Sequence, residues 1–570
     1  MKRKHFLLLF GAILLAALFL RLNAINTTEP WWDENLYTVR PYNFLESDHL
    51  STIDQAPLYF YLADVVYKIM GLSVFSARFL SLFFGMLSIP LLYLVVREIA
   101  SKEHALISSA FLAFSGFHIA YTIGDMGLAA TFFILLFLYF FIKLLKTGEN
   151  KYLLLCSLTA ALGTLIKSYM LIFAFSCGLY FIYSLYRKGG LDASSFLKKF
   201  PLKYLIASLI LFLFFVSPIL IYNLLLFQEK GQMDIIFTRF FRLDESAYAG
   251  LGMPEFDVSI LPGNLANMVS NYFLHHDMAI FSLAVLGMLL VAYKREGEHT
   301  SLLLLCFLLP LFFLLCSTQL PKNFVFFAPI ISFFAADAVI FLSSKAAPFF
   351  KFNHLLAMLV LIVLALNLYA IISNYERSFP TVQLRDEVSK YSPQSTLFIA
   401  DSRIYRGKFT FALMDRHYAE TLELRYVPFA KDEANSVLTK TVFIECVPGD
   451  CGWGAGKVDA TLTAEEISSL KKNLVAGKDI LHNGKPYYRI YSGFLSLEPY
   501  SLSGLDYVHS FYFYPVAWKE KRLSQDNYNT ENSLHSLGKI AIYLSIIAAI
   551  VLSLYSIYVF ARFCKKEQTE

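Results

Sequence analysis

Charged residues are scarce in this chain. Asp, Glu, Lys and Arg make up 16% of its 570 residues, whereas a soluble globular protein carries about 25%. Long apolar runs take their place, so that 57% of the residues are hydrophobic. This balance excludes an ordinary soluble protein and predicts a polytopic protein surrounded by membrane lipid.

Several catalytic motifs are missing. The sequence contains no phosphate-cradling glycine loop, no G-x-S-x-G elbow and no H-E-x-x-H. Nucleotide-driven and serine-type chemistry therefore have no support, and no nucleic-acid partner is expected. There is also no repeat of 20–50 residues and no relation between the two halves in hydropathy.

Cysteine is sparse, with seven residues. Cys156, Cys177, Cys306 and Cys316 fall in apolar runs, where a buried thiol is usually inert. Cys446 and Cys451 are joined by a Val-Pro-Gly-Asp turn, which leaves a disulfide open if the compartment is oxidising. Two sulfurs without a further Cys/His pair make a metal site the weaker alternative.

Long apolar runs dominate what is present. A spanning helix needs about 20 mostly apolar residues. The first run follows Lys2-Arg3-Lys4 and has no small-residue cleavage site, since Arg21 and Asn23 stand where one would lie, so we expect a retained helix. Twelve spans are predicted: 5–25, 74–97, 104–122, 126–146, 152–166, 169–186, 204–225, 278–293, 301–317, 324–343, 355–373 and 537–562.

The positive residues test this count. With Lys2-Arg3-Lys4 cytoplasmic, every second connection should be rich in Lys and Arg. The connections concerned contain Arg97/Lys102, Lys143/Lys146/Lys151, Arg187/Lys188/Lys198/Lys199/Lys203, Lys294/Arg295, Lys345/Lys351 and Arg562/Lys565/Lys566. We therefore expect a multi-pass cell-membrane protein with both termini cytoplasmic.

The extracytoplasmic face then receives two long loops, 26–73 and 226–277, and the region 374–536. In the first loop, 57–71 is apolar but interrupted by two charges, as in a helix lying in the membrane interface.

The region 374–536 has ordinary polarity and short apolar runs such as 396–400, 441–445 and 487–491, which predict strands of a small α/β domain. The predicted fold is thus an all-α membrane domain over 1–373, an extracytoplasmic α/β domain over 374–536, and a last helix with a tail over 537–570.

Two adjacent carboxylates follow the first span directly. Asp33 and Glu34 come after Trp31 and Trp32, and Trp favours the membrane–water interface. A half-desolvated carboxylate is costly, so it usually does chemistry or closes an ion pair. The alternative is an ordinary helix start, where acidic residues are favoured.

Other polar residues are expected at the same face. Asp54 precedes Pro57 in a pattern that also fits a helix entry. Three cations are expected at outer helix ends, although Lys and Arg usually favour the cytoplasmic side: Arg78, Lys167 and Lys322. Each either extends its charged group to the lipid headgroups or holds an anion such as a lipid phosphate. In the second loop, His275-His276-Asp277 suggests a metal site only weakly, and solvated polar residues are the favoured interpretation.

At this point the chain resembles a known family. The motif W-x-D-E-x-x-Y after the first helix, the segment A-P-L-Y-F-Y-L from Ala56, and G-x-S-x-x-S-A-R-F-L-S from Gly71 are similar to GT-C membrane glycosyltransferases. More specifically they resemble the branch of protein O-mannosyltransferases and lipid A aminoarabinose transferases. The resemblance is strongest over 26–185 and continues as architecture, with Leu320-Pro321-Lys322-Asn323-Phe324 preceding an apolar helix.

The resemblance implies an enzyme that transfers a sugar, with inversion, from a polyprenyl-phosphate donor to an acceptor hydroxyl of a protein, lipid or glycan on the outer face. It makes Asp33 and Glu34 the catalytic residues. The substrate-binding candidates are Asp54, Tyr59, Arg78, Asp125, Lys167 and Lys322. No cofactor is certain, and a divalent metal is left open.

Two departures from the family pattern matter. The P-P-L motif reads A-P-L at 56–58, and Gly124-Asp125-Met126-Gly127 stands where relatives often have an arginine. Any phosphate contact of that arginine must come from elsewhere.

Two rival functions remain. A twelve-helix transporter predicts related halves and polar residues at mid-depth, whereas the spans read as apolar with acids at one surface. A non-catalytic scaffold that displays 374–536 would leave those acids and cations without a purpose.

Overall fold

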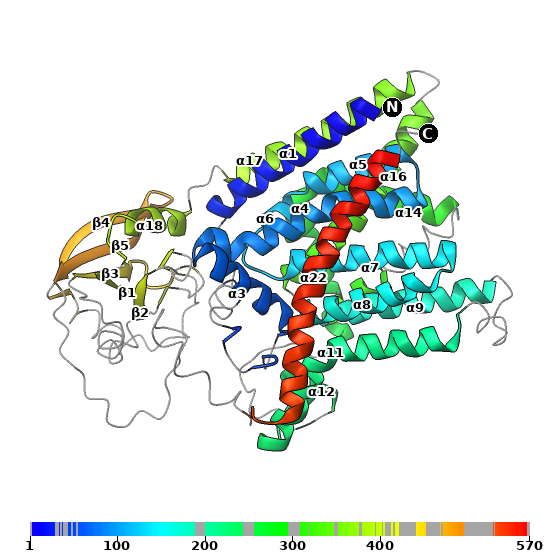
Figure 1. Cartoon of the computed structure of the whole chain (residues 1–570). Coiled ribbons are helices and arrows are strands. Elements are labelled where there is room, and N and C mark those ends of the chain that lie inside the picture. The colour runs from blue at the N-terminus through cyan, green and yellow to red at the C-terminus, as the bar shows by residue number, and fades with distance from the viewer. Residues whose placement is uncertain are drawn as a thin grey trace.

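The structure is a computed structural model of the whole chain (Figure 1). It describes residues 3–28, 55–187, 200–241, 256–294, 308–317, 320–346, 351–375, 379–393, 395–401, 440–451, 474–494 and 530–566, with shorter pieces at 34, 37, 44–46, 49–52, 243, 403–404, 408, 412–413, 416–420, 468, 471–472 and 528. Asp33 and Asp54, two of the predicted site residues, lie outside the described residues.

A bundle of long apolar helices forms most of the molecule. Its first half comprises α1 (Arg3–Thr27), α3 (Leu58–Met70), α4 (Val74–Ile99), α5 (Lys102–Ala113), α6 (Gly116–Ala120), α7 (Gly127–Thr147), α8 (Asn150–Ile166) and α9 (Met170–Arg187). Its second half comprises α11 (Leu202–Lys230), α12 (Ile235–Phe240), α13 (Leu261–Asn267), α14 (Leu274–Lys294), α16 (Ala328–Ala346), α17 (Phe352–Tyr375) and α22 (Ser533–Lys566). Short η helices cover Val258–Ile260, Met268–Phe273, Pro321–Asn323 (η4) and Val325–Phe327 (η5).

Eight helices among the described residues are long and apolar enough to cross a membrane. The expected total of twelve is not confirmed: Asn150–Ile166 and Met170–Ser184 are shorter apolar helices, and of the predicted span 301–317 only 308–317 is described. The predicted span 104–122 is not one continuous helix. It is broken into α5 and α6, because the backbone leaves the helical path between Ala113 and Gly116.

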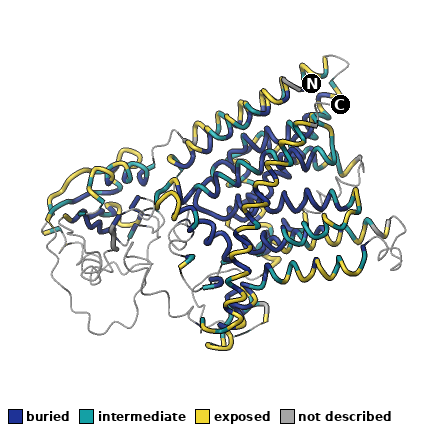
Figure 2. Tube along the Cα trace, viewed as in Figure 1, coloured by how far each residue is buried: buried dark blue, intermediate teal, exposed yellow. Residues whose placement is uncertain are grey.

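Burial separates the helices into a core and a lipid-facing shell (Figure 2). α7 is buried along most of its length, and α4 and α16 are also largely buried. In α1, α11 and α17 only a third or fewer of the residues are buried, as expected where hydrocarbon rather than water is the solvent. The predicted interfacial helix exists as α3, but most of its side chains are packed into the bundle.

The small α/β domain is confirmed. One sheet has the order β2-β1-β3-β5-β4, formed by β1 (Thr396–Ala400), β2 (His417–Glu420), β3 (Lys440–Cys446), β4 (Val475–His482) and β5 (Lys485–Phe494). β1 pairs in parallel with β2 and β3, whereas β5 pairs antiparallel with β3 and β4. The predicted strands at 396–400, 441–445 and 487–491 correspond to β1, β3 and β5, and α18 (Pro380–Val388) packs Leu384 and Val388 into their core.

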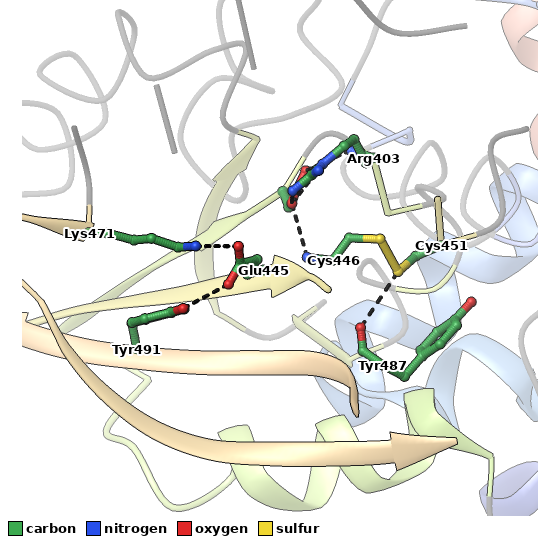
Figure 3. Close-up of polar contacts among 8 residues, drawn as sticks. Arg403, Glu445, Cys446, Cys451, Lys471, Tyr487 and Tyr491 are labelled. Atoms are coloured by element: carbon green, nitrogen blue, oxygen red, sulfur yellow. Dashed lines mark hydrogen bonds and ion pairs between the residues drawn. A yellow bond between two sulfur atoms is a disulfide. The ribbon is translucent and has the colours of Figure 1, made fainter. Parts of the chain in front are cut away.

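The sheet domain contains a disulfide and contacts the helix bundle. Cys446, at the end of β3, bonds to Cys451, so the disulfide left open by the sequence is present (Figure 3). The buried Asp401 carboxylate accepts from the Cys446 amide at 2.9 Å and from the Arg403 guanidinium. Leu72, between α3 and α4, packs against both hydrophobic cores.

The two chain ends lie together, at the end of the bundle remote from the sheet domain (Figure 1). We call the opposite end, where the sheet domain lies, the sheet end. α1 runs from the N-terminus towards it.

Candidate functional site

Glu34 and Arg78 form a buried ion pair. The Arg78 Nε and Nη2 atoms donate to the two oxygens of Glu34 at 2.6 and 2.7 Å, and both side chains are almost completely buried. The third guanidinium nitrogen, Nη1, donates to the carbonyls of Ile25 and Thr28 at 2.9 and 3.2 Å. The pair therefore fastens the chain that follows α1 to the first turns of α4.

A second loop joins this pair. The Gly124 amide donates to Glu34 Oε1 at 2.8 Å. The next residue, Asp125, is buried, and its carboxylate accepts from the Gly127 amide at 2.7 Å, which caps the start of α7. Its carbonyl accepts from the Ser81 hydroxyl at 2.7 Å. We call residues 121–126, between α6 and α7, the site loop.

Lysines and aromatic rings form the neighbouring part of the site. Lys322, in η4, is buried and donates to the Tyr37 hydroxyl at 2.7 Å. Lys167, at the end of α8, is also buried, with its Nζ 5.3 Å from the centre of the Phe326 ring and 5.8 Å from that of Tyr169. Such contacts stabilise a desolvated cation through the ring quadrupole.

Tyr59 lies near Asp125, Glu34 and Tyr37. It is fully buried at the start of α3. Burial raises the pKa of Tyr59, and the nearby carboxylates of Asp125 and Glu34 raise it further. The pKa of Tyr169 is likewise raised by burial, whereas the positive charge of Lys322 lowers it. Both hydroxyls therefore remain neutral hydrogen-bond donors at physiological pH.

Gly127 allows the two parts to approach. A Cβ atom at this position would lie 2.8 Å from Val325 Cγ1 and 3.3 Å from the carbonyl oxygen of Lys322. The start of α7 can therefore contact the η4–η5 segment that carries Lys322. A larger residue at 127 would push these elements apart.

The structure thus brings six of the eight predicted site residues into one region: Glu34, Tyr59, Arg78, Asp125, Lys167 and Lys322. Tyr37 and Tyr169 were not predicted. Tyr37 is the last residue of the quoted W-x-D-E-x-x-Y motif, so its place in that motif was a usable signal.

The His275-His276-Asp277 segment has another role. The Asp277 carboxylate is buried and accepts from the Gly116 amide at 2.6 Å, so the expectation of a solvated residue is wrong. Among the described residues, no group of three His, Cys, Asp or Glu side chains could hold a metal ion.

The helix interior is also less apolar than the sequence suggested. Arg21, in the middle of an apolar run, is fully buried and hydrogen-bonded to His118 at 2.8 Å. An arginine inside a predicted span indicates a buried partner elsewhere in the bundle.

Comparison with known proteins agrees with this architecture. A profile of the dolichyl-phosphate-mannose-protein mannosyltransferase family matches residues 54–222. No curated protein gives a significant sequence match. The crystal structure of ArnT from Cupriavidus metallidurans in the apo state has a TM-score of 0.52 and 12% identity, covering 86% of this chain and 98% of that one. The same enzyme bound to undecaprenyl phosphate has a TM-score of 0.53, with the same identity and coverage.

The likeness to ArnT shows a shared fold. Together with the profile match, it confirms the resemblance to GT-C membrane glycosyltransferases that the motifs after the first helix indicated.

Proposed function

We propose that this chain is an integral-membrane glycosyltransferase that moves a sugar, with inversion, from a polyprenyl-phosphate donor to an acceptor hydroxyl. The observation that carries the proposal is the meeting of buried lysines with a carboxylate-bearing loop at the ends of apolar helices. The profile match and the fold shared with ArnT, which binds undecaprenyl phosphate, support it.

The sheet end is proposed to be the extracytoplasmic face, with both chain termini cytoplasmic. The alternation of Lys- and Arg-rich connections and the disulfide in the sheet domain support this orientation. The acceptor is proposed to be a hydroxyl of a protein, lipid or glycan.

The donor carries its own leaving group, so the enzyme needs a base and a means of holding phosphate. As the acceptor O–H attacks the anomeric carbon, a new C–O bond forms and the bond from that carbon to the phosphate oxygen breaks. The electron pair leaves with polyprenyl phosphate, and the acceptor proton passes to the base. Attack opposite the leaving group inverts the anomeric centre.

Asp33 is our proposed base. Glu34, its sequence neighbour, has both carboxylate oxygens bound by Arg78, so we assign Glu34 and Arg78 to positioning the segment that carries Asp33. Asp54 remains a proposed substrate-binding residue on sequence grounds.

The lysines are proposed to hold the donor phosphate. Lys322 and Lys167 bring two cations into a buried, aromatic-lined region, where charge acts more strongly than in water. Tyr59 can add a neutral hydrogen bond. Asp125 is proposed to line the site while its carboxylate caps α7.

One observation favours the transporter alternative: the broken α5–α6 helix has charged partners, a feature that transporters also use. Both charges, however, bind backbone groups of the helix itself. A vesicle uptake assay with candidate sugars separates the two functions, because a transporter would accumulate solute without consuming a lipid-linked donor.

Asp33→Asn provides the direct test of the proposed chemistry. With purified protein, a polyprenyl-phosphate sugar and a hydroxyl acceptor, we expect transfer to fall at least about a hundredfold, as for loss of a general base. The thermal unfolding midpoint should be unchanged. An unaffected transfer rate excludes Asp33 as the base. Mass spectrometry of the lipid-linked sugar that co-purifies would identify the donor.

A further inference from the structure

The break between α5 and α6 comes before α5 has reached the length of a membrane crossing. α5 has 12 residues, which at 1.5 Å per residue reach about 18 Å, and the hydrocarbon core is about 30 Å thick. Backbone groups freed by a break at this depth cannot turn to water, so protein groups must satisfy them.

Arg21 donates hydrogen bonds to the carbonyl groups at the end of α5. From a position six residues before the end of α1, its Nη1 donates to the Ala113 carbonyl at 2.9 Å and its Nη2 to the Leu112 carbonyl at 3.3 Å. A cation at this position also complements the negative end of the helix dipole. Asn367, in α17, donates to the carbonyl of Phe114 at 3.3 Å.

Asp277 accepts hydrogen bonds from donor groups at the start of α6. One carboxylate oxygen accepts from the Gly116 amide at 2.6 Å and from Asn367 at 2.8 Å. The other accepts from the Ser115 hydroxyl at 2.5 Å and the Phe117 amide at 3.3 Å. Asp277 reaches this position because α14 is kinked there, with φ −135° and ψ 36°.

The two ends are tied to each other and tightly packed. Arg21 Nη2 lies 2.8 Å from His118 Nδ1 in α6, so one guanidinium spans the break. A Cβ atom at Gly116 would lie 2.6 Å from the carbonyl oxygen of His276. On α4, a Cβ at Gly85 would lie 3.4 Å from the His118 ring. Residues of α1, α4, α14 and α17 therefore pack around the break. We call the backbone of 112–117 and the side chains that bind it, Arg21, Asp277 and Asn367, the joint.

The joint leads directly into the site loop. α6 ends at Ala120, four residues before Gly124, whose amide binds Glu34, and five before Asp125, which caps α7. A short helix fixed at its first turn has little freedom at its last, so the joint sets where these groups lie.

We infer that Arg21 and Asp277 are positioning residues for the transferase site: two opposite charges that hold a broken membrane helix and thereby place the site loop. The inference rests on the proposed function for its consequence in catalysis. Its structural part, the coupling of the joint to the loop, stands separately.

The test compares Asp277→Asn with Asp234→Asn in the full-length protein. Asp234 is also a buried carboxylate that caps a helix, accepting from the Phe237 amide at 2.8 Å and from Asn223 at 2.7 Å, but the helix that it caps is α12 rather than α6. Asp277→Asn should lower kcat by about ten- to a hundredfold, because a displacement of about 1 Å can cost that much. KM for the polyprenyl-phosphate donor should change less. Asp234→Asn should leave both within about twofold.

Hydrogen exchange at the Gly124 amide gives a readout independent of activity. Asp277→Asn and Arg21→Met should accelerate exchange at 121–126 more than in α7 or α16. If exchange rises equally everywhere, or if Gly124 stays protected while only the unfolding midpoint falls, the inference is wrong. Ser115→Ala removes one of the four bonds to Asp277 together with the cap that Ser115 Oγ provides for the His118 amide. It serves if Asp277→Asn does not fold, with the same exchange pattern expected. If the wild-type protein transfers no sugar, the proposed function fails, while the exchange measurement still decides the coupling.

Discussion

Single residues in this protein take their roles from the partners that the fold gives them. Glu34 and its sequence neighbour Asp33 are indistinguishable as types of residue in a W-W-D-E run. The structure binds both Glu34 oxygens to Arg78 and adds the Gly124 amide. A carboxylate whose two oxygens are both occupied by donors is held in one place and has little room to accept a further proton, which suits a structural anchor better than a general base.

Replacement of Arg78 tests this anchor. Arg78→Met should destabilise the protein by about 3–5 kcal/mol, because it leaves the buried Glu34 carboxylate without its cation. The double variant Arg78→Met with Glu34→Met should recover part of that loss, since neither charge remains. Unfolding by SDS titration measures both. A double variant no more stable than Arg78→Met alone would contradict the assignment of Glu34 as its partner.

Lys322 should matter for donor binding rather than for stability. Lys322→Gln removes a charge proposed to bind phosphate, and a charge-assisted hydrogen bond contributes about 1.5–3 kcal/mol. We expect KM for the donor to rise about ten- to a hundredfold, measured by steady-state transfer assays. Lys345→Gln, an exposed residue at the other end of α16, is the matched control and should change nothing. Equal effects of the two changes would argue against a phosphate contact at Lys322.

At the scale of elements, broken or closely packed backbone carries the site. Segment 104–122 reads as one apolar span, but Arg21 and Asp277 supply the hydrogen bonds that two extra helix ends require. Without those partners a break in the membrane would cost several kcal/mol per unsatisfied group. Pattern reading cannot find such a break, because its partners lie on helices far away in sequence.

In the sheet, the edge pairing of β4 with β5 should depend on pH. Asp479 and Arg489 lie opposite each other, with nitrogen–oxygen distances of 2.6 and 2.9 Å. Hydrogen bonding from Arg489 holds the pKa of Asp479 below its usual value of 3.8. Because the folded pKa is lowered, the pair stabilises the sheet above that usual value, and the stabilisation is lost as pH falls through the lowered pKa.

The effect should be small, at most about 1 kcal/mol, because both side chains are about one-third exposed. Hydrogen exchange of the β4 and β5 amides at about pH 6 and about pH 2.5, corrected for intrinsic rates, measures it. Asp479→Asn should remove this pH dependence while β1 and β3 are unaffected. A variant with an unchanged pH profile would show that the pair does not couple to strand stability.

At the scale of the whole molecule, the two ends of the bundle have different characters. The chain termini lie at one end and the sheet domain at the other (Figure 1). The site residues occupy helix ends and connections, where polar groups can collect without crossing the hydrocarbon. The proposed orientation, with the sheet domain extracytoplasmic, therefore implies that the proposed transferase site faces the same side.

Single cysteines can test this sidedness. In a background with Cys306 and Cys564 replaced by Ala, we would compare Val475→Cys, at an exposed position of β4, with Lys565→Cys, near the end of α22. A membrane-impermeant maleimide should label Val475→Cys in intact cells, and Lys565→Cys only after the membrane is opened, because the reagent cannot cross lipid. The reverse pattern would invert the proposed topology.

The class of protein, the α/β domain with its strands β1, β3 and β5, and six polar residues that lie near one another in the fold were all predictable from the sequence. These follow from apolar run length, alternating charge and short motifs, which are local properties of the chain. Three features needed the three-dimensional structure: the pairing of Glu34 with Arg78, the hydrogen bond from Lys322 to Tyr37, and the division of one expected span into two helices. Those outcomes depend on which distant groups meet in a low-dielectric interior, where each buried donor, acceptor and charge must find a partner.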